Sequence, residues 1–262
     1  MSAESKKKKI VVTGAGGNMG RAIVNGLKET GEYEVVACSH NPKEGYDDFL
    51  LELSDPESCI QALEGADVVI HMAFWKSPKR EFFIPNGVES NIKGMFNLFE
   101  AARINGVKRV IFGSSNHVFG FYPVEMDVDD HAAYRPDSIY GLCKCWGELL
   151  GRYYSDRFGI SSINIRIGHS RGDREIVDIG SRECKQWISN KDLVQLMIKC
   201  IEADDSLMYD CFPGISANED MWSLDRAREI LGYHPVDDGH TMITPETKYT
   251  ETAYKGGQYP TY

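Results

Sequence analysis

Three side chains in the middle of the chain could together take the proton of an alcohol while its hydride leaves to a separate acceptor. Tyr140 and Lys144 form the chain's only Tyr-x-x-x-Lys, and at this spacing they share one face of a helix. A neighbouring ammonium favours the phenolate, which makes Tyr140 a candidate general base. Ser115 lies 25 residues upstream, at the end of an expected strand, where a parallel sheet presents groups to a ligand. The three residues predict hydride-transfer chemistry.

A glycine-rich run near the start of the chain could bind a dinucleotide. Gly14, Gly17 and Gly20 lie between an apolar strand and an amphipathic helix. Such glycines allow a tight turn, close approach of a pyrophosphate and close helix packing. A glycine-rich turn that binds nothing is the alternative, and the flanking strand and helix favour the dinucleotide. The other cofactor contacts that we expect here and further along the chain are Asn18, Met19, Ala73, Tyr140 and Lys144.

The residues at the end of the second expected strand bear on the choice between NAD and NADP. NAD enzymes usually place an Asp or Glu there for the adenosine ribose, and this chain has Ser39. Without that acid, His40 or Lys43 could approach a 2′-phosphate, so NADP is as strongly expected as NAD. Glu52 and Leu53 resemble the acidic-apolar pair that flanks adenine, although Glu52 could equally be a surface residue on an edge strand.

Apolar runs and helical spacing alternate along most of the chain. The expected strands are residues 9–13, 33–38, 49–53, 67–73, 109–113, 162–167 and 210–213. The expected helices are residues 19–29, 56–63, 88–104, 138–158, 190–203 and 223–231. This alternation predicts an α/β, doubly wound parallel-sheet Rossmann fold with a small C-terminal substrate-binding lobe.

We expect four parts of unequal size. A flexible basic tail covers residues 1–8, and the Rossmann dinucleotide-binding domain covers residues 9–170. The substrate-side lobe, interleaved with that domain, covers residues 171–236, and an irregular tail covers residues 237–262. The tail has no periodicity that would indicate its role.

Composition excludes several classes of partner. A formal net charge of -10 over 262 residues disfavours nucleic acid, which is bound by clustered Lys and Arg. The basic run Lys6 to Lys9 could be a localisation signal or a membrane tether, and a solvated tail is the stronger expectation. No apolar stretch is long enough to span a membrane.

The seven cysteines indicate the compartment. No signal peptide precedes them, so we expect reduced thiols and a cytoplasmic location. No cluster of Cys and His has the spacing of a zinc site, and no metal is expected.

Several motifs together resemble a known family. The glycine run, Asn91 before a helix, SSNH at 114–117 and the Tyr140/Lys144 pair are similar to those of extended short-chain dehydrogenases/reductases, the NAD-dependent epimerase/dehydratase superfamily. The resemblance covers roughly residues 8–235. Within that superfamily, three segments resemble uronate dehydrogenases and their relatives: SSNHVFGFYP at 114–123, RPDSxYG at 135–141 and IRIG at 165–168.

The resemblance implies roles for four residues. Tyr140 would be the base, Lys144 would lower its pKa and bind the nicotinamide ribose, and Ser115 would hold the reacting oxygen. Asn91 would help to keep a proton-relay water in place. Ser115 could instead cap a strand end and Asn91 its helix. The implied reaction is oxidation of a free sugar's anomeric hydroxyl to an aldonolactone, in a homo-oligomer whose subunits, as a dimer or higher assembly, meet through the Tyr140 helix.

The same resemblance limits the range of expected substrates. Asn116 and His117 match family positions that meet sugar hydroxyls, and they stand where related dehydratases carry an Asp-Glu pair. Epimerases of the superfamily usually have a larger C-terminal lobe, whereas 122 residues follow Tyr140 here. A compact sugar is therefore expected, with a sugar epimerase and a non-catalytic dinucleotide sensor as alternatives.

An anionic group on the sugar is the last expectation. Arg182, five residues before Trp187, matches the family's uronate-binding arginine, and a guanidinium suits a bidentate anion. His169 replaces the family's Ser after Arg-Ile-Gly and is expected near the substrate. Because Arg171 and Arg174 lie nearby, a hexose 6-phosphate or a sulfosugar is as plausible as a uronate, and a solvated charged loop is the alternative.

Overall fold

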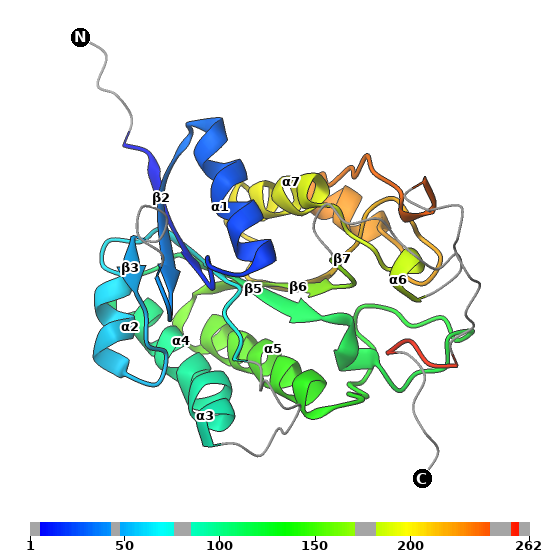
Figure 1. Cartoon of the computed structure of the whole chain (residues 1–262), viewed down its shortest axis with the longest axis horizontal. Helices are drawn as coiled ribbons and strands as arrows, with labels where there is room; N and C mark the ends of the chain where they lie inside the picture. Colours follow the sequence, from blue (N-terminus) through cyan, green and yellow to red (C-terminus); the bar gives the residue numbers. More distant parts are fainter. Residues whose placement is uncertain (1–5, 43–47, 76–84, 171–181, 242–252, 257–262) are drawn as a thin grey trace.

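One parallel sheet of seven strands forms the centre of the molecule. The computed structural model describes residues 6–42, 48–75, 85–170, 182–241 and 253–256. The strands are arranged in the order β3-β2-β1-β4-β5-β6-β7 (Figure 1). Their bounds are β1 (Lys8–Thr13), β2 (Tyr33–Ser39), β3 (Phe49–Leu50), β4 (Val68–His71), β5 (Arg109–Ser115), β6 (Ser161–Ile167) and β7 (Tyr209–Gly214). The predicted doubly wound fold is confirmed.

Helices cover both faces of this sheet. In Figure 1, α1 (Asn18–Thr30) and α7 (Asn190–Ile201) lie on one face, and α2 (Pro56–Ala62), α4 (Gly94–Ile104) and α5 (Ile139–Phe158) lie on the other. Each face has its own apolar core. Because both faces are covered, the central strands read as nearly continuous apolar runs, and every residue of β4 and β5 is buried.

Polar residues begin the helices where the sequence indicated. The carboxylate of Asp55 accepts a hydrogen bond from the Glu57 amide and caps α2, and Pro56 occupies the first position of that helix. The hydroxyls of Ser138 and Ser189 cap α5 and α7 in the same way. The cap before α5 fixes where Tyr140 enters the helix.

One predicted helix is interrupted. The expected helix at 88–104 is divided into α3 (Pro85–Val88), a π-helical turn η1 (Glu89–Lys93) and α4. The π turn contains Asn91, whose side chain bonds to the Trp75 backbone. Just after it, Gly94 packs so closely on Leu53 that a Cβ there would lie 2.7 Å from the Leu53 Cβ. Helical periodicity does not report these tertiary contacts, so the sequence predicted one regular helix.

Two elements beyond residue 170 belong to the sheet layers. β7 pairs in parallel with β6, and α7 packs beside α1. The remaining described elements of this region are short: α6 (Arg182–Lys185), the π turn η3 (Ala227–Leu231) and the 3-10 turn η4 (Gly239–Thr241). The helix expected at 223–231 is a single helical stretch over residues 225–231 that ends in this π turn.

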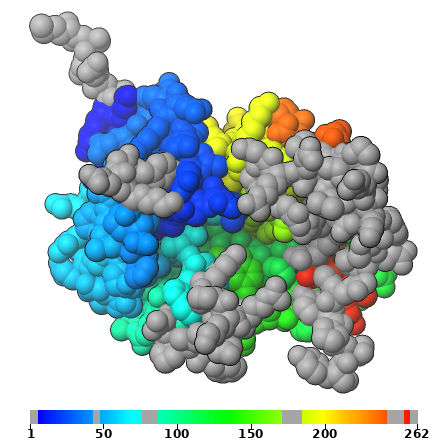
Figure 2. Space-filling model, viewed as in Figure 1, coloured from blue at the N-terminus to red at the C-terminus, as the bar shows by residue number. Residues whose placement is uncertain are grey.

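Residues 253–256 of the predicted irregular tail lie against a segment from the middle of the chain. Residues 253–256, red in Figures 1 and 2, lie beside the green segment that follows β5. Pro123 and Tyr254 form an antiparallel bridge there. All seven cysteines are buried, and none of them forms a disulfide within the part of the chain that the structure describes. Among the helices described, none combines the length and the apolar character needed to cross a membrane.

Candidate active site

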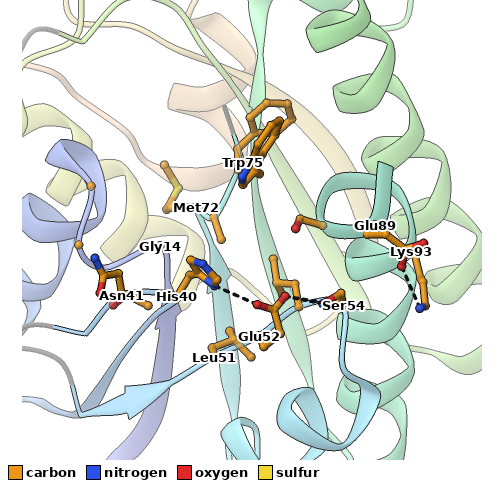
Figure 3. Close-up of a pocket in the computed structure, with 17 residues that line it drawn as sticks. Gly14, His40, Asn41, Leu51, Glu52, Ser54, Met72, Trp75, Glu89 and Lys93 are labelled. Carbon is orange, nitrogen blue, oxygen red and sulfur yellow. Dashed lines mark hydrogen bonds and ion pairs between the residues drawn. The ribbon is translucent and has the colours of Figure 1, made fainter. Parts of the chain in front are cut away.

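A cavity of about 760 Å³ opens at the carboxyl ends of β1, β2 and β4 (Figure 3). This is the edge of a doubly wound sheet at which ligands bind. Six of the predicted cofactor contacts line the cavity: Gly14, Gly17, Ser39, Glu52, Leu53 and Ala73. The predicted contacts Asn18, Met19 and Gly20 form the first turn of α1 beside it.

The glycines keep the wall of this cavity free of side chains. Gly14 adopts φ +70°, and a Cβ there would lie 2.6 Å from the Ala73 nitrogen. A Cβ at Gly20 would overlap the Gly14 carbonyl oxygen, so α1 approaches the turn as closely as backbones allow. None of the side chains that the structure describes caps the N-terminus of α1, and the first turn of this helix holds no acidic residue. This cradle fits the pyrophosphate of a dinucleotide, because the open amides and the helix dipole favour an anion.

The far end of the cavity holds the polar groups expected for the adenosine ribose. The Ser39 hydroxyl is buried and finds no hydrogen-bond partner among the described residues. His40 Nδ1 lies 2.9 Å from Glu52 Oε2, and the Ser54 hydroxyl donates to Glu52 Oε1 at 2.7 Å. The Ser54 hydroxyl and amide, with His40, hold the pKa of Glu52 below its ordinary value. The Glu52 side chain is therefore an ionised carboxylate in the wall of the cavity. Lys43, the other residue expected near a 2′-phosphate, lies outside the described residues.

The Tyr-x-x-x-Lys pair does not line this cavity but lies next to it, on the other side of Phe74. The Tyr140 ring meets Phe74, which lines the cavity, edge to face at 4.9 Å. Lys144 Nζ lies 5.5 Å from the centre of the Tyr140 ring and donates to the Gly113 carbonyl at 2.6 Å. The expected placement of an ammonium beside the phenol is thus present in α5. This arrangement suits Tyr140 to proton transfer next to a dinucleotide-sized cavity.

A buried histidine beneath this pair carries no charge. His71 Nδ1 lies 2.7 Å from the Thr13 hydroxyl. Burial, assisted by the charge of Lys144, lowers the pKa of His71 to about 3. The imidazole is therefore neutral near pH 7, and Lys144 is the cation that faces Tyr140 from this side.

Ser115 ends β5, as its predicted role requires. It is buried, its hydroxyl donates to Asn116 Oδ1 at 3.1 Å, and it accepts from the His117 amide at 3.3 Å. The second bond caps the 3-10 turn η2 (Asn116–Phe119), so the capping alternative also describes Ser115. His117 in turn meets the fully buried carboxylate of Asp137 at 2.7 Å and lies edge to face with Tyr140 at 5.5 Å.

Asn91 lies close to the site but makes a different contact from those anticipated. Its Oδ1 accepts from the Trp75 amide at 2.8 Å, and its Nδ2 donates to the Trp75 carbonyl at 3.0 Å. The Asn91 side chain therefore holds the segment that follows β4 instead of capping its own helix. That segment carries Phe74, the ring that meets Tyr140.

The predicted substrate residues are placed unevenly. Asn116 is buried beside Ser115, and its Nδ2 donates to Gln186 Oε1. His169 follows β6 and pairs with Trp187 in a parallel bridge. Arg182 begins α6, and its side chain, like the whole of Arg171 and Arg174, lies outside the described residues.

Sequence reasoning missed several residues that shape this site. Phe74 and Trp75 had a usable signal, since an aromatic pair directly after a buried strand reaches the ligand edge of the sheet. Asp137 stands inside the quoted segment at 135–141, two residues before the helix of Tyr140. Gln186 carried no signal, because its partners are about 70 residues away in both directions.

Comparison with known proteins agrees with this arrangement. Residues 10–191 match the model of the NAD dependent epimerase/dehydratase family. The chain is 34% identical to the L-arabinose 1-dehydrogenase (NAD(P)(+)) of Haloferax volcanii, over 90% of this chain and 99% of that protein. It is 32% identical to the NAD-dependent glucose-6-phosphate dehydrogenase of the same organism, over 87% and 93% of the two chains. The crystal structure of uronate dehydrogenase from Agrobacterium tumefaciens superposes with a TM-score of 0.81, at 29% identity and 96% coverage of both chains.

Proposed function

Because the chain belongs to the NAD dependent epimerase/dehydratase family, we propose that it is an NAD(P)-dependent dehydrogenase that oxidises the C1 hydroxyl of a free sugar to the lactone. The observation that carries this proposal is the Tyr140 phenol, flanked by Lys144 and reached through Phe74 from the glycine-lined cavity. Relatives that span nearly the whole chain are named as dehydrogenases of arabinose and glucose 6-phosphate, which supports a sugar as the substrate.

Each residue of the inner site has a role in this reaction. A dinucleotide bound along Gly14 and Gly17 supplies the hydride acceptor. Tyr140 accepts the proton of the C1 hydroxyl, and the positive charge of Lys144 stabilises the phenolate that performs this step. Ser115 holds the reacting oxygen, and Asn91 keeps the wall of the site in place through Trp75.

The substrate-binding roles extend the proposal to an anionic sugar. Arg182 binds a carboxylate or phosphate on C6, with Asn116, His117 and His169 near the sugar hydroxyls. A relative named for glucose 6-phosphate supports an anion, whereas one named for arabinose shows that a neutral sugar is a real competitor. Arg182 belongs to the substrate-side lobe, residues 171–236, whereas Asn116, His117 and His169 belong to the dinucleotide-binding domain, residues 9–170.

The test of the function is reduction of the nicotinamide, followed by its absorbance, with a panel of aldoses, uronates and hexose 6-phosphates and with both NAD and NADP. At least one sugar should be oxidised. Tyr140→Phe should lower kcat at least about a hundredfold, the lower range for a general base, while cofactor still binds. Tyr33→Phe is the control, because the Tyr33 hydroxyl donates to Glu202 Oε1 at 2.9 Å at the start of β2, the end of the strand opposite the cavity. A kcat within tenfold of wild type for Tyr140→Phe would contradict the assignment.

Arg182→Ala tests the anion-binding role. A charged hydrogen bond is worth about 1.5–3 kcal/mol, so its loss should lower kcat/KM about ten- to a hundredfold on the anionic sugar. The neutral parent aldose should be affected far less. Equal losses on both sugars would show that Arg182 supports its loop and does not bind the anion.

Two alternatives have distinct outcomes in the same assay. A sugar epimerase would convert the sugar without net accumulation of reduced nicotinamide. A non-catalytic sensor would bind the dinucleotide and leave every sugar unchanged. Intact Ser115, Tyr140 and Lys144 favour the dehydrogenase over the sensor.

The proposal also covers the oligomeric state of the enzyme and its location in the cell. Leu142, Trp146, Leu149 and Tyr153 form an exposed apolar stripe on α5. A homo-oligomer formed through this helix would bury that stripe, and light scattering of the purified protein measures its mass. Seven cysteines that are buried and form no disulfide among the described residues support a cytoplasmic location.

A further inference from the structure

A chain of hydrogen bonds joins Ser115 to the C-terminal tail. The Ser115 hydroxyl donates to Asn116 Oδ1 at 3.1 Å, and Asn116 Nδ2 donates to Gln186 Oε1. Gln186 Nε2 then donates to the Lys255 carbonyl at 3.1 Å, with Met221 Sδ at the same distance. Asn116, Gln186 and Lys255 are each no more than 2% exposed. Ser115 and Asn116 are neighbours in the sequence, whereas Gln186 and Lys255 come from distant parts of it, and the four residues meet in the interior.

The tail segment is fixed where this chain of bonds ends. Its backbone pairs with residues 120–124, the stretch directly after η2. The Lys255 amide donates to the Tyr122 carbonyl at 2.9 Å, and the Gly256 amide donates to the Gly120 carbonyl at 2.9 Å. The Val124 amide donates to the Ala253 carbonyl at 3.1 Å. Residues 253–256 are thus held like a strand against the segment that leaves the active site.

The side chain of Lys255 fixes the tail from a second direction. Its Nζ donates to the Met221 carbonyl at 3.2 Å and lies 4.6 Å from the Trp222 ring. Burial lowers the pKa of this ammonium, and burying a lysine costs free energy unless its charge is well coordinated. The interactions with Met221 and Trp222 offset that cost and tie the tail to the segment before η3.

Gln186 itself has little freedom to move. Its carbonyl accepts from the His169 amide at 2.7 Å, and a Cβ at Gly168 would overlap that carbonyl oxygen. Both ends of its carboxamide are used, since Oε1 accepts from Asn116 and Nε2 donates to Lys255. This pattern permits one orientation of the Asn116 amide, with Oδ1 facing Ser115.

We propose that Gln186 is a positioning residue for the reaction, and that residues 253–256 complete the active site by orienting Asn116 and Ser115 through it. The inference rests on the proposed function, because that function gives Ser115 its contact with the sugar. A side chain that holds a reacting group in place acts mainly on the rate of the chemical step, and small misplacements there are costly.

The test is Gln186→Met in the full-length protein, assayed with the sugar and the cofactor that wild type uses best. Methionine keeps the volume and the apolar stem but makes neither hydrogen bond of the carboxamide. We expect kcat to fall about ten- to a hundredfold, with the dissociation constant of the dinucleotide unchanged. Gln195→Met is the control for the same substitution, because Gln195 Oε1 accepts a hydrogen bond from the His234 amide at 2.8 Å, on α7 away from the site. This control should keep the wild-type kcat.

A second variant tests the part played by the tail and does not depend on the folding of the first. Lys255→Met removes the bond to the Met221 carbonyl and should lower kcat in the same direction. Lys255→Met loosens the tail and can reach Ser115 only through the bond between Gln186 Nε2 and the Lys255 carbonyl, so in the double variant the loss should be no greater than that of Gln186→Met alone. Additive losses in the double variant would contradict a shared route through Gln186.

The remaining outcomes show whether the inference alone fails or the proposed function fails with it. A Gln186→Met protein with wild-type kcat and a lowered melting temperature would show a purely structural role and overturn the inference alone. Equal kcat losses in Gln186→Met and Gln195→Met would overturn it as well. A wild-type protein that oxidises no sugar would overturn the proposed function and the inference together.

Discussion

The two sides of the active site are built by different means. On the dinucleotide side, the cavity is shaped by backbone: Gly14 and Gly20 leave no space for side chains, and the amides of α1 are open. On the substrate side, Ser115 is surrounded by buried side-chain contacts that reach Asp137 through His117 and Gln186 through Asn116. A ligand common to many enzymes can be held by backbone, whereas a particular sugar requires particular side chains.

A large buried ion pair reinforces the substrate side. Glu148 lies two turns after Tyr140 on α5, and both of its oxygens bond to Arg166 of β6, at 3.1 and 2.8 Å. The Ser114 hydroxyl, beside Ser115, donates to Glu148 Oε1 at 2.5 Å. The helix that carries the base and the strand that ends in the serine are thus joined through one carboxylate. If the two sides differ in this way, changes in backbone geometry at the glycines should weaken cofactor binding. Changes in the buried contacts of Glu148 and Arg166 should instead lower the stability of the fold around the substrate.

The largest expected effect is that of Gly14→Val on the dinucleotide side. The new side chain would collide with the backbone of Ala73, at a position with φ +70°, and fill the space needed by the pyrophosphate. We expect no detectable binding of NAD or NADP in a fluorescence titration. Gly31→Val is the control, because Gly31 has a similar φ of +68° and nothing within 4 Å of its Cβ position. Equal loss of binding in the two variants would show that backbone strain, and not the cradle, is responsible.

On the substrate side, Glu148→Gln should have the next largest effect. It leaves the Arg166 guanidinium buried without an opposite charge at Glu148, and breaking a buried ion pair costs about 3–5 kcal/mol. The free energy of unfolding, measured in urea, should fall by this amount. Glu89→Gln, which breaks the exposed pair with Lys93, should change it little. If the free energy of unfolding changed equally little in both variants, the buried pair of Glu148 and Arg166 would stabilise the fold no more than an exposed ion pair does.

The smallest effect is expected from Ser39→Asp, which changes cofactor choice and not binding as such. A carboxylate at the end of β2 would repel a 2′-phosphate and accept from the ribose hydroxyls, so the ratio of kcat/KM with NAD to that with NADP should rise at least about tenfold. Ser39→Ala removes the unpartnered hydroxyl without adding charge and should leave the ratio nearly unchanged. An unchanged ratio in Ser39→Asp would place the adenosine ribose elsewhere in the cavity.

The same contrast explains what could be predicted from the sequence. The sheet, the glycine cradle and the Tyr140/Lys144 placement follow from short-range patterns, because spacing of three or four residues and apolar runs fix local geometry. The π turn at Asn91 and the buried Gln186 depend on contacts between distant segments, and no local pattern reports those. Residues 253–256 of the tail looked featureless because their conformation is defined by backbone pairing with residues 120–124.

The central claim is that hydride leaves C1 of a free sugar, and isotope transfer measures this most directly. The purified protein is given oxidised cofactor and a sugar accepted in the panel assay, deuterated either at C1 or at C4, and the reduced cofactor is analysed by mass spectrometry. The account predicts one deuterium in the nicotinamide from the C1-labelled sugar and none from the C4-labelled sugar, with a lactone as the first product. Deuterium arriving from C4, or an epimerised sugar with no net reduced cofactor, would contradict the account.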